Sequence, residues 1–592
     1  MTKIEKALFV LLATIAVSYV GLRAYLNPLV NDEAYTFLYF IYTDRFIPFD
    51  TIFWSANNHP VNSLLTWVCY KLIGLEEWAL RLPNVLAFIL FTLYSFKIGT
   101  LLRSTWIRWS FWVSLLATPY LLELFGYTRG YGLSIAFFTA AIWHFIKAVE
   151  RKKLLLDWQT WLFMIFALFS NLNLVNSYFI WILLFAFFSF GTTSWLKWTL
   201  HIFIRASILI IPILMGLQLK FYDQLYFGFQ TNILDSFHSL LAALYGDISP
   251  VWCFFIIAVT ILTAIGIVIS KISSPQSKNT YFIIGIFLTL NILASLVQFW
   301  FLDVNLPRER TTIHWYFLLI ASLFFSLDFI QTYWKKAFFL CIPLLLIPLG
   351  QIHRYNLFRA SLDDWALQQF SDDFYNDLVK LQKDNNQLLT FESNVLFNKH
   401  VYDYLNMKNG TQLNDLQYAW NITNTSADIV LISDSLGQFP AKDYKIISSD
   451  KQNSTSLLKR KSPKILTPVY NYQIPHPDKI ENQRYEFGDI GLDTLKNKNL
   501  MFSFSMDIRA SSAPHLLYTT IELKDSIGEI IATEQIEITP LRHDWTNASN
   551  TKFTFTWYNI PASANLAHVY IWNYRVPKIS VEAAECTIFK LD

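Results

Sequence analysis

The chain has 592 residues, a formal net charge of +3 and a mean hydropathy of +0.33, with 54% hydrophobic and only 15% charged residues. A soluble protein of this length would carry about 25% charged residues, so these values exclude a wholly soluble protein. The sequence has no basic block or arginine-rich arm, which gives no support to nucleic-acid binding. The apolar runs end near residue 355, which predicts a polytopic membrane domain over 1–355 followed by a water-soluble region.

The apolar runs predict about eleven helical membrane spans. They lie near 6–26, 81–102, 107–125, 130–148, 158–175, 177–193, 199–218, 250–270, 281–302, 311–331 and 336–352. The first run could be mistaken for a signal peptide, but the many spans after it favour an uncleaved anchor.

Lysine and arginine collect in alternate loops, which predicts the orientation of the chain in the membrane. The basic side chains in these loops are Arg103, Arg108, Lys147, Arg151, Lys152, Lys153, Lys197, Lys271, Lys278, Lys335 and Lys336. If the N-terminus is cytoplasmic, all of them lie inside, and most acidic loop residues lie outside. With an odd number of spans, the C-terminal region is extracytoplasmic. We therefore expect an integral protein of a bacterial inner or plasma membrane, in contact with membrane lipids.

Two outer loops are long, near 27–80 and 219–249. Short apolar segments at 46–54 and 61–68 within the first loop predict helices along the membrane surface.

The soluble region divides into two parts. A helical pattern followed by short strand-like runs predicts a small α/β module over 356–462. Alternation of apolar residues with period two, as in Phe502, Phe504, Met506 and Ile508, predicts a β-sandwich over 463–592. Four aromatic residues, Trp557, Tyr570, Trp572 and Tyr574, are candidates for carbohydrate binding, although packing within the sheets is the more common use of such residues.

The stretch around Asp32 and Glu33 follows the first span directly, on the predicted outer side. Two carboxylates there are either solvated charges or a base at the membrane surface. A carboxylate within hydrogen-bonding reach can take the proton of a hydroxyl acceptor as it attacks. The residues alone leave both readings open.

Further polar residues gather on the same predicted outer face. His59 precedes Pro60 in the first outer loop; a lone histidine is more often structural, and no ligand spacing supports the alternative of a divalent metal. Arg81 begins the second span, and Arg129 lies with Tyr131 in the next outer turn. Arg308 and Arg310 stand before the span at 311–331, against the positive-inside trend. A guanidinium suits a phosphate, and the alternative is contact with lipid headgroups.

The order of these motifs resembles the GT-C superfamily of glycosyltransferases. The similarity is greatest to the protein O-mannosyltransferase and aminoarabinose-transferase group (glycosyltransferase family 39-like). The matching residues are Asp32, Glu33, Tyr35, His59, Pro60, Arg81, Leu82, Pro83, Arg129 and Tyr131. The resemblance covers about 1–355 and not the soluble region. At Val61 the sequence departs from the family, which often has a second proline after His-Pro.

The resemblance implies a fold, a reaction and site residues. The fold would be a GT-C-like membrane domain. The reaction would transfer a sugar from a polyprenyl-phosphate donor, with inversion, to a protein, lipid or polysaccharide hydroxyl outside the cytoplasm. Asp32 would be the general base, supported by Glu33. Arg308 or Arg310, with Arg81 and Arg129, would face the donor phosphate, and Tyr35, His59 and Tyr131 would contact substrate. No cofactor is required by this scheme, and a divalent metal stays an open alternative.

Two other classes of function compete with this hypothesis. A transporter or flippase of lipid-linked sugars should show charged residues or broken helices near the bilayer midplane, often in paired halves. Here the candidate residues lie at the outer edge, and the sequence shows no internal repeat. A membrane-anchored binding protein that acts through its β-sandwich would not need eleven spans.

Overall fold

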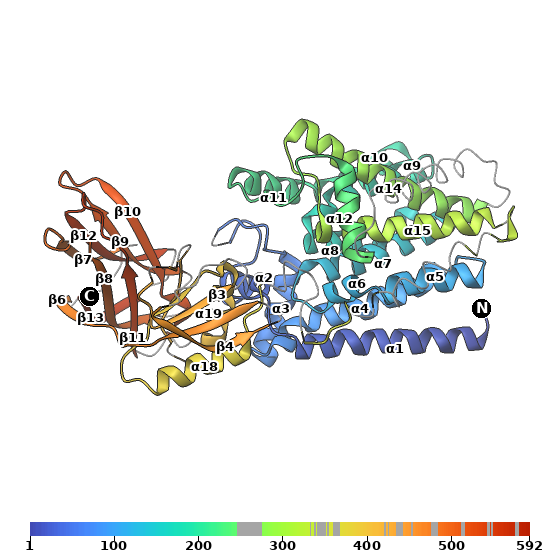
Figure 1. The fold of residues 1–592 in the computed structure, drawn as a ribbon. Helices are drawn as coiled ribbons and strands as arrows, with labels where there is room; N and C mark the ends of the chain where they lie inside the picture. The colour runs from blue at the N-terminus through green and yellow to red at the C-terminus, as the bar shows by residue number, and fades with distance from the viewer. Residues whose placement is uncertain are drawn as a thin grey trace. The chain divides into compact units, whose positions relative to one another are not determined.

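The computed structural model describes residues 1–592 except 52, 246–274, 332, 337, 338, 340–350, 352, 353, 359–367, 412, 420, 421, 424, 434–441, 452, 453, 475–483, 511–515, 542–544, 546–548, 575–578 and 592. The chain forms two compact units (Figure 1). Unit 1 consists of Met1–Asn27 and Phe46–Leu362, and unit 2 consists of Pro28–Arg45 and Asp363–Asp592. The stretch that holds Asp32 and Glu33 thus belongs to the same unit as the C-terminal region, although the predicted boundary near 355 places it with the membrane domain.

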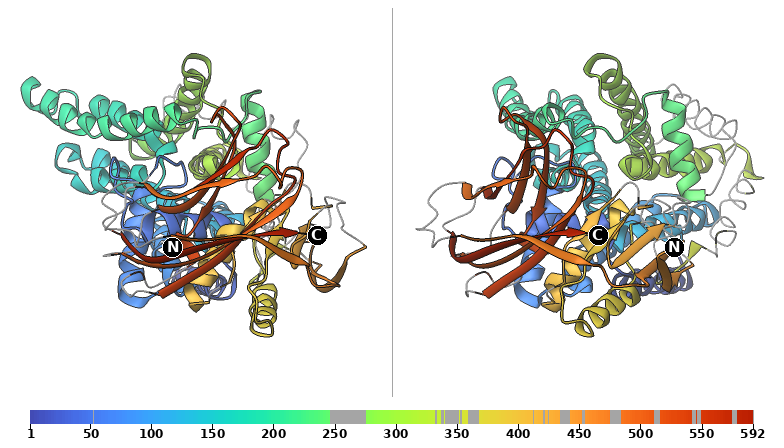
Figure 2. Two further views of the ribbon diagram at one scale, coloured as in Figure 1. Left: turned by 90° about the vertical axis from the view of Figure 1, so that its left-hand side faces the viewer. Right: turned by 60° about the vertical axis from the view of Figure 1, so that its left-hand side comes forward.

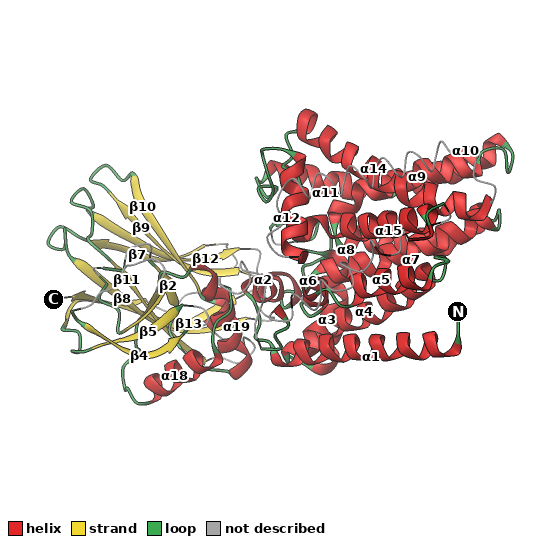
Figure 3. Ribbon diagram, turned by 45° about the vertical axis from the view of Figure 1, so that its right-hand side comes forward, coloured by secondary structure: helices red, strands yellow, loops and turns green. Residues whose placement is uncertain are grey.

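Unit 1 is helical (Figure 3). Its principal helices are α1 (Lys3–Leu26), α3 (Pro60–Ile73), α4 (Glu77–Gly99), α5 (Thr105–Leu116), α6 (Pro119–Phe125), α7 (Gly130–Glu150), α8 (Trp158–Ser170), α9 (Val175–Ser189), α10 (Trp195–Ser207), α11 (Ile210–Phe221), α12 (Ile233–Tyr245), α14 (Pro275–Leu302) and α15 (Ile313–Ile330). The buried helix α7 packs against α4 and α8, and α14 packs against α15.

Within the described residues, seven helical segments are long and apolar enough to cross a membrane. They are Lys3–Leu26, Glu77–Gly99, Gly130–Glu150, Leu172–Ser189, Trp195–Phe221, Thr280–Leu302 and Glu309–Ile330. The chain is therefore a polytopic helical membrane protein. The predicted span at 158–175 contains the shorter helix α8, and the predicted spans at 250–270 and 336–352 fall wholly or largely outside the described residues.

Two sequence predictions in unit 1 are wrong in detail. The run at 107–125 is divided into α5 and α6, because Pro119 lacks a backbone N–H and occupies the first turn of a new helix. The described residues of 46–54 form no helix; Phe49, after Pro48, has a positive φ of 68°, which interrupts helical geometry. The other predicted surface segment, 61–68, lies within α3.

The first part of unit 2 is an α/β module. It contains α18 (Asp372–Lys383), β1 (Phe391–Ser393), α19 (Lys399–Asn409), β2 (Leu416–Tyr418), β3 (Ile429–Ser433), β4 (Tyr444–Asp450) and β5 (Thr455–Arg460). The sheet has the order β2-β1-β3-β5-β4. Strand β1 runs parallel to both β2 and β3, and the helix α19 makes the crossover from β1 to β2 that a parallel pair requires.

The second part consists of two four-stranded antiparallel sheets (Figure 2). Its strands are β6 (Leu466–Ile474), β7 (Arg484–Gly491), β8 (Asn499–Ala510), β9 (Leu516–Lys524), β10 (Ile530–Glu537), β11 (Ser549–Trp557), β12 (Leu566–Tyr574) and β13 (Ile579–Leu591). The sheet orders are β10-β9-β12-β7 and β11-β8-β13-β6. Alternate residues of β8, including Phe502 and Met506, enter one core with residues of the other sheet such as Ile521 and Val569.

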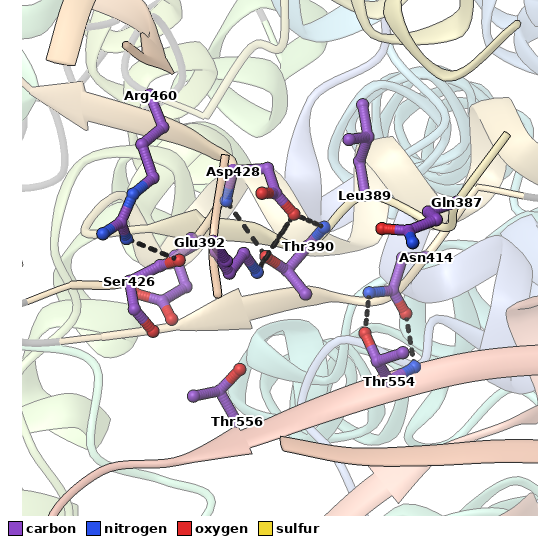
Figure 4. Close-up of polar contacts among 12 residues, drawn as sticks. Gln387, Leu389, Thr390, Glu392, Asn414, Ser426, Asp428, Arg460, Thr554 and Thr556 are labelled. Atoms are coloured by element: carbon purple, nitrogen blue, oxygen red, sulfur yellow. Dashed lines mark hydrogen bonds and ion pairs between the residues drawn. The ribbon is translucent and has the colours of Figure 1, made fainter. Parts of the chain in front are cut away.

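Side-chain hydrogen bonds join the α/β module to β11, which is an edge strand. The Thr554 amide donates to Asn414 Oδ1 (2.8 Å), and Asn414 Nδ2 donates to Thr554 Oγ1 (Figure 4). The Thr556 amide donates to Gln417 Oε1 (3.0 Å). Nearby, Lys464 pairs with Asp428 at 3.0 Å. These side chains satisfy edge amides that another strand would otherwise pair with, which protects the edge and holds the two parts of unit 2 together.

Candidate functional site

Asp32 and Glu33 lie in the first turn of the short helix α2 (Asn31–Thr36), which continues into a π-helical turn, η1 (Phe37–Ile41). Carboxylates at this end of a helix are favoured by its dipole. Glu33 Oε2 accepts a hydrogen bond from the Val30 amide (3.1 Å), and Glu33 is only 1% exposed. Asp32 is also buried, at 8% exposure. Glu33 thus caps the helix that carries Asp32.

Helix α19 of the C-terminal region packs against α2. His400 Nδ1 lies 2.8 Å from Asn31 Oδ1, and the His400 ring meets the Tyr35 and Tyr39 rings edge-on, with centroids 5.1 and 5.6 Å away. Burial and the neighbouring Lys399 lower the pKa of His400 to about 4. This imidazole is therefore neutral at physiological pH.

A buried charged group lies beside η1. The Tyr39 hydroxyl donates to Glu537 Oε2 at 2.6 Å, and Lys399 pairs with Asp403 (3.4 Å) and with Asp415. Burial raises the pKa of Asp403 to about 6 and that of Glu537 to about 7. Sequence reasoning missed His400 and Glu537, because Asn31 and Tyr39, which they contact, are hundreds of positions away. It also missed Lys399, whose partners Asp403 and Asp415 stand in an ordinary polar stretch of sequence.

In unit 1, His59, Arg129 and Arg310 come together at one end of the helices. His59 is buried and hydrogen-bonded to the backbone of Ser170, and its ring meets that of Tyr131 edge-on at 5.2 Å. Burial lowers the pKa of His59 well below its ordinary value, and the positive charges of Arg129 and Arg310 lower it further. Three of the predicted residues therefore form one positively charged group, which we call the cationic cluster (His59, Arg129 and Arg310).

The backbone at Gly130 allows this close approach. A Cβ atom at Gly130 would lie 1.8 Å from the Ser170 carbonyl oxygen and 2.7 Å from His59 Cγ. Only glycine fits there. Arg129, which is 1% exposed, donates from Nη2 to Asn57 Oδ1 (2.8 Å).

Arg308 and Arg310 flank Glu309 at the start of α15. The Arg310 guanidinium lies 4.7 Å from the centre of the Phe227 ring, and that of Arg308 lies 5.3 Å from the centre of the Phe229 ring. Arg308 also pairs with Glu309 at 2.7 Å, and its side chain is partly exposed. Both arginines thus rest on aromatic rings of the loop before α12.

Arg81 has a different environment from the cationic cluster. It is fully buried and donates to the backbone carbonyls of Ala24 and Asn27, and its guanidinium lies 5.5 Å from the centre of the Tyr127 ring. Arg23 and Glu123 form a buried ion pair at 2.7 Å, and the Tyr127 hydroxyl also donates to Glu123. The sequence reading missed this pair, because hydropathy averaging hides a single charge in an apolar run. A role of Arg81 in donor binding stays a prediction.

Two further predictions concern a metal site and carbohydrate binding by aromatic residues. Within the described part of the chain, no group of three or more His, Cys, Asp and Glu residues is arranged to hold a metal ion. The neighbours of His59 are cationic, which disfavours a divalent cation at that position. Trp557 and Tyr570 are buried and Trp572 is partly buried, whereas the side chain of Tyr574 lies outside the described residues. Carbohydrate binding by the β-sandwich stays a prediction.

No protein-family model and no curated protein matches the chain. Among solved structures, the chain is similar to ArnT from Cupriavidus metallidurans bound to undecaprenyl phosphate, with 12% identity and a TM-score of 0.47 over 77% of this chain and 98% of that one. It is similar to the arabinosyltransferase EmbB from Mycobacterium smegmatis, with 11% identity and a TM-score of 0.29 over 98% and 64% of the two chains. It is also similar to the archaeal oligosaccharyltransferase AglB from Archaeoglobus fulgidus, with 9% identity and a TM-score of 0.40 over 98% of each chain.

EmbB and AglB are by name an arabinosyltransferase and an oligosaccharyltransferase, and the ArnT structure holds undecaprenyl phosphate. At these identities and with TM-scores below 0.5, the likenesses carry no conclusion about the fold or the activity of this chain.

Proposed function

We propose that the chain is an integral-membrane glycosyltransferase that moves a sugar from a polyprenyl-phosphate donor to an acceptor hydroxyl on the extracytoplasmic side, with inversion at the anomeric carbon. The observation that carries the proposal is the cationic cluster, in which residues of three separate loops converge. Two guanidiniums beside a neutral imidazole suit a phosphate group, and Arg308 would add to the same positive field.

The reaction would proceed by a single displacement. The acceptor oxygen bonds to the anomeric carbon while the bond from that carbon to the phosphate oxygen breaks. Asp32 takes the hydroxyl proton, and the electrons of the broken bond leave with polyprenyl monophosphate. Cationic side chains stabilise the charge that develops on the leaving phosphate. One carboxylate is sufficient, because a phosphate leaves without protonation by a general acid.

Asp32 and Glu33 would have separate tasks in this scheme. Glu33 is engaged as the cap of α2 and would support catalysis by fixing the helix. Asp32 is the carboxylate assigned to the acceptor proton. The donor and the acceptor class remain those that the sequence resemblance implies, with protein, lipid and polysaccharide hydroxyls as candidates.

Two variants test the two roles independently. Asp32→Asn should abolish sugar transfer while expression and membrane topology stay as in the wild type. Normal transfer by this variant would refute the assignment of Asp32 as the general base. Replacing Arg308 and Arg310 together with glutamine should first raise the apparent KM for the polyprenyl-phosphate sugar. Unchanged donor affinity would show that this loop does not bind the donor phosphate.

Tags at each terminus, probed for accessibility from either side of the membrane, test the proposed orientation, with a cytoplasmic N-terminus and an extracytoplasmic C-terminus.

A further inference from the structure

The helix that carries Asp32 is too short to be stable alone. Helix α2 has 6 residues and η1 has 5, whereas isolated helices of fewer than about 12 residues are marginal in water. Contacts with the C-terminal region therefore have to hold this segment in place. The Phe37 ring meets that of Tyr404 on α19 edge-on at 5.5 Å, and Tyr39 donates to Glu537.

His400 contacts the turn that carries Asp32. Its Nδ1 atom is 2.8 Å from Asn31 Oδ1, and Asn31 immediately precedes Asp32 in the first turn of α2. Between the edges of Tyr35 and Tyr39, the imidazole has little freedom to rotate. The single N–H of the neutral ring can donate to the Asn31 oxygen and fix the orientation of this turn.

The charge state of His400 suits this task. Burial keeps the ring neutral, although the nearby Asp32 carboxylate favours its protonated form. A cation at this position would lower the basicity of Asp32, because an opposite charge stabilises the ionised carboxylate. A neutral hydrogen-bond donor orients the turn without that loss.

We infer that His400, on α19 of the C-terminal region, is a positioning residue for Asp32, which it orients through its hydrogen bond to Asn31. This inference rests on the proposed transferase function. It gives the soluble C-terminal region a part in catalysis, because His400 lies outside the first 355 residues.

Steady-state kinetics of the full-length chain with a polyprenyl-phosphate sugar would test it. His400→Phe keeps a ring between Tyr35 and Tyr39 but cannot donate, and it should lower kcat about tenfold with the donor KM within twofold of the wild type. His400→Asn places an amide N–H near the position of Nδ1 and should restore most of kcat. Asn409→Ala, at the exposed end of α19, is the matched control and should match the wild type.

The outcomes separate the inference from the proposed function. If Asp32→Asn is inactive but His400→Phe keeps full kcat, or raises the donor KM instead, the inference is wrong and the transferase assignment stands. If Asp32→Asn transfers sugar at the wild-type rate, Asp32 is not the base and the inference falls with that assignment. If the wild-type chain transfers no sugar, the proposed function itself is wrong. Should His400→Phe not fold, Asn31→Ala removes the acceptor from the other side, and it must lower kcat to the same extent; unchanged kcat in that variant overturns the inference.

Discussion

The buried carboxyl of Glu537 predicts that unit 2 loses stability as the pH rises. Burial raises its pKa from 4.5 to about 7. Between these values the unfolded chain releases the proton while the folded chain keeps it, so the unfolded state binds fewer protons and the free energy of unfolding falls with increasing pH. The loss begins near pH 4.5 and is complete somewhat above pH 7. Its size is about 3 kcal/mol, at about 1.4 kcal/mol for each tenfold change in proton affinity.

Glu537→Gln isolates this contribution. The amide keeps the side-chain shape and an oxygen that can accept the Tyr39 hydroxyl, but it does not titrate. Asp403, whose pKa burial raises to about 6, titrates in both proteins, so the difference between the two curves reports Glu537. The two chains should be equally stable near pH 4.5, and the variant should be more stable by about 3 kcal/mol near pH 8.

Hydrogen exchange followed by mass spectrometry provides the assay. Peptides from β9 and β10 of the detergent-solubilised full chain report the opening free energy of this part of the sandwich, after correction for the intrinsic exchange rate at each pH. Glu529→Gln, at an exposed position directly before β10, is a control for the change of charge. Parallel curves for wild type and Glu537→Gln from pH 4.5 to 8 would refute the argument.

Two further predictions concern contacts that hold each unit together. Asn414→Leu leaves the edge amide of Thr554 buried and unpaired, and should reduce the opening free energy of β11 by about 2 kcal/mol, measured by the same exchange experiment, whereas Lys552→Ala on an exposed position of β11 should have no effect. Arg23→Met removes the guanidinium that pairs with the buried Glu123 carboxylate and should cost about 3–5 kcal/mol, seen as a lower Tm. Replacing both members of the pair by apolar residues should recover most of this loss; no recovery would contradict the argument.

The parts of the fold that local patterns determine could be predicted from the sequence. Apolar runs of sufficient length predicted the helices of unit 1, and alternation in β8 matches the side chains that enter the sandwich core. Pro119 is a local signal for the break between α5 and α6, because proline is favoured in the first turn of a helix and disfavoured in its interior.

The features that the sequence did not predict depend on contacts between distant segments. His400 and Asn31 are separated by 369 positions, and neither is unusual in its local sequence. The membership of Pro28–Arg45 in unit 2 has the same cause, because that segment is held by α19 and β10 rather than by its sequence neighbours. In the cationic cluster, the motifs identified the individual residues, but their convergence required the fold of three loops and the close approach at Gly130.

The fate of the lipid phosphate tests the central claim most directly. Purified wild-type chain in vesicles is given a polyprenyl-monophosphate sugar and an envelope extract as acceptor, and free polyprenyl monophosphate is measured. The wild type should release it, and Asp32→Asn should release it about 10²–10⁴-fold more slowly while binding the lipid equally well. Equal release by Asp32→Asn would contradict the account. So would movement of the lipid-linked sugar between leaflets by the wild type without any release, which would indicate a flippase.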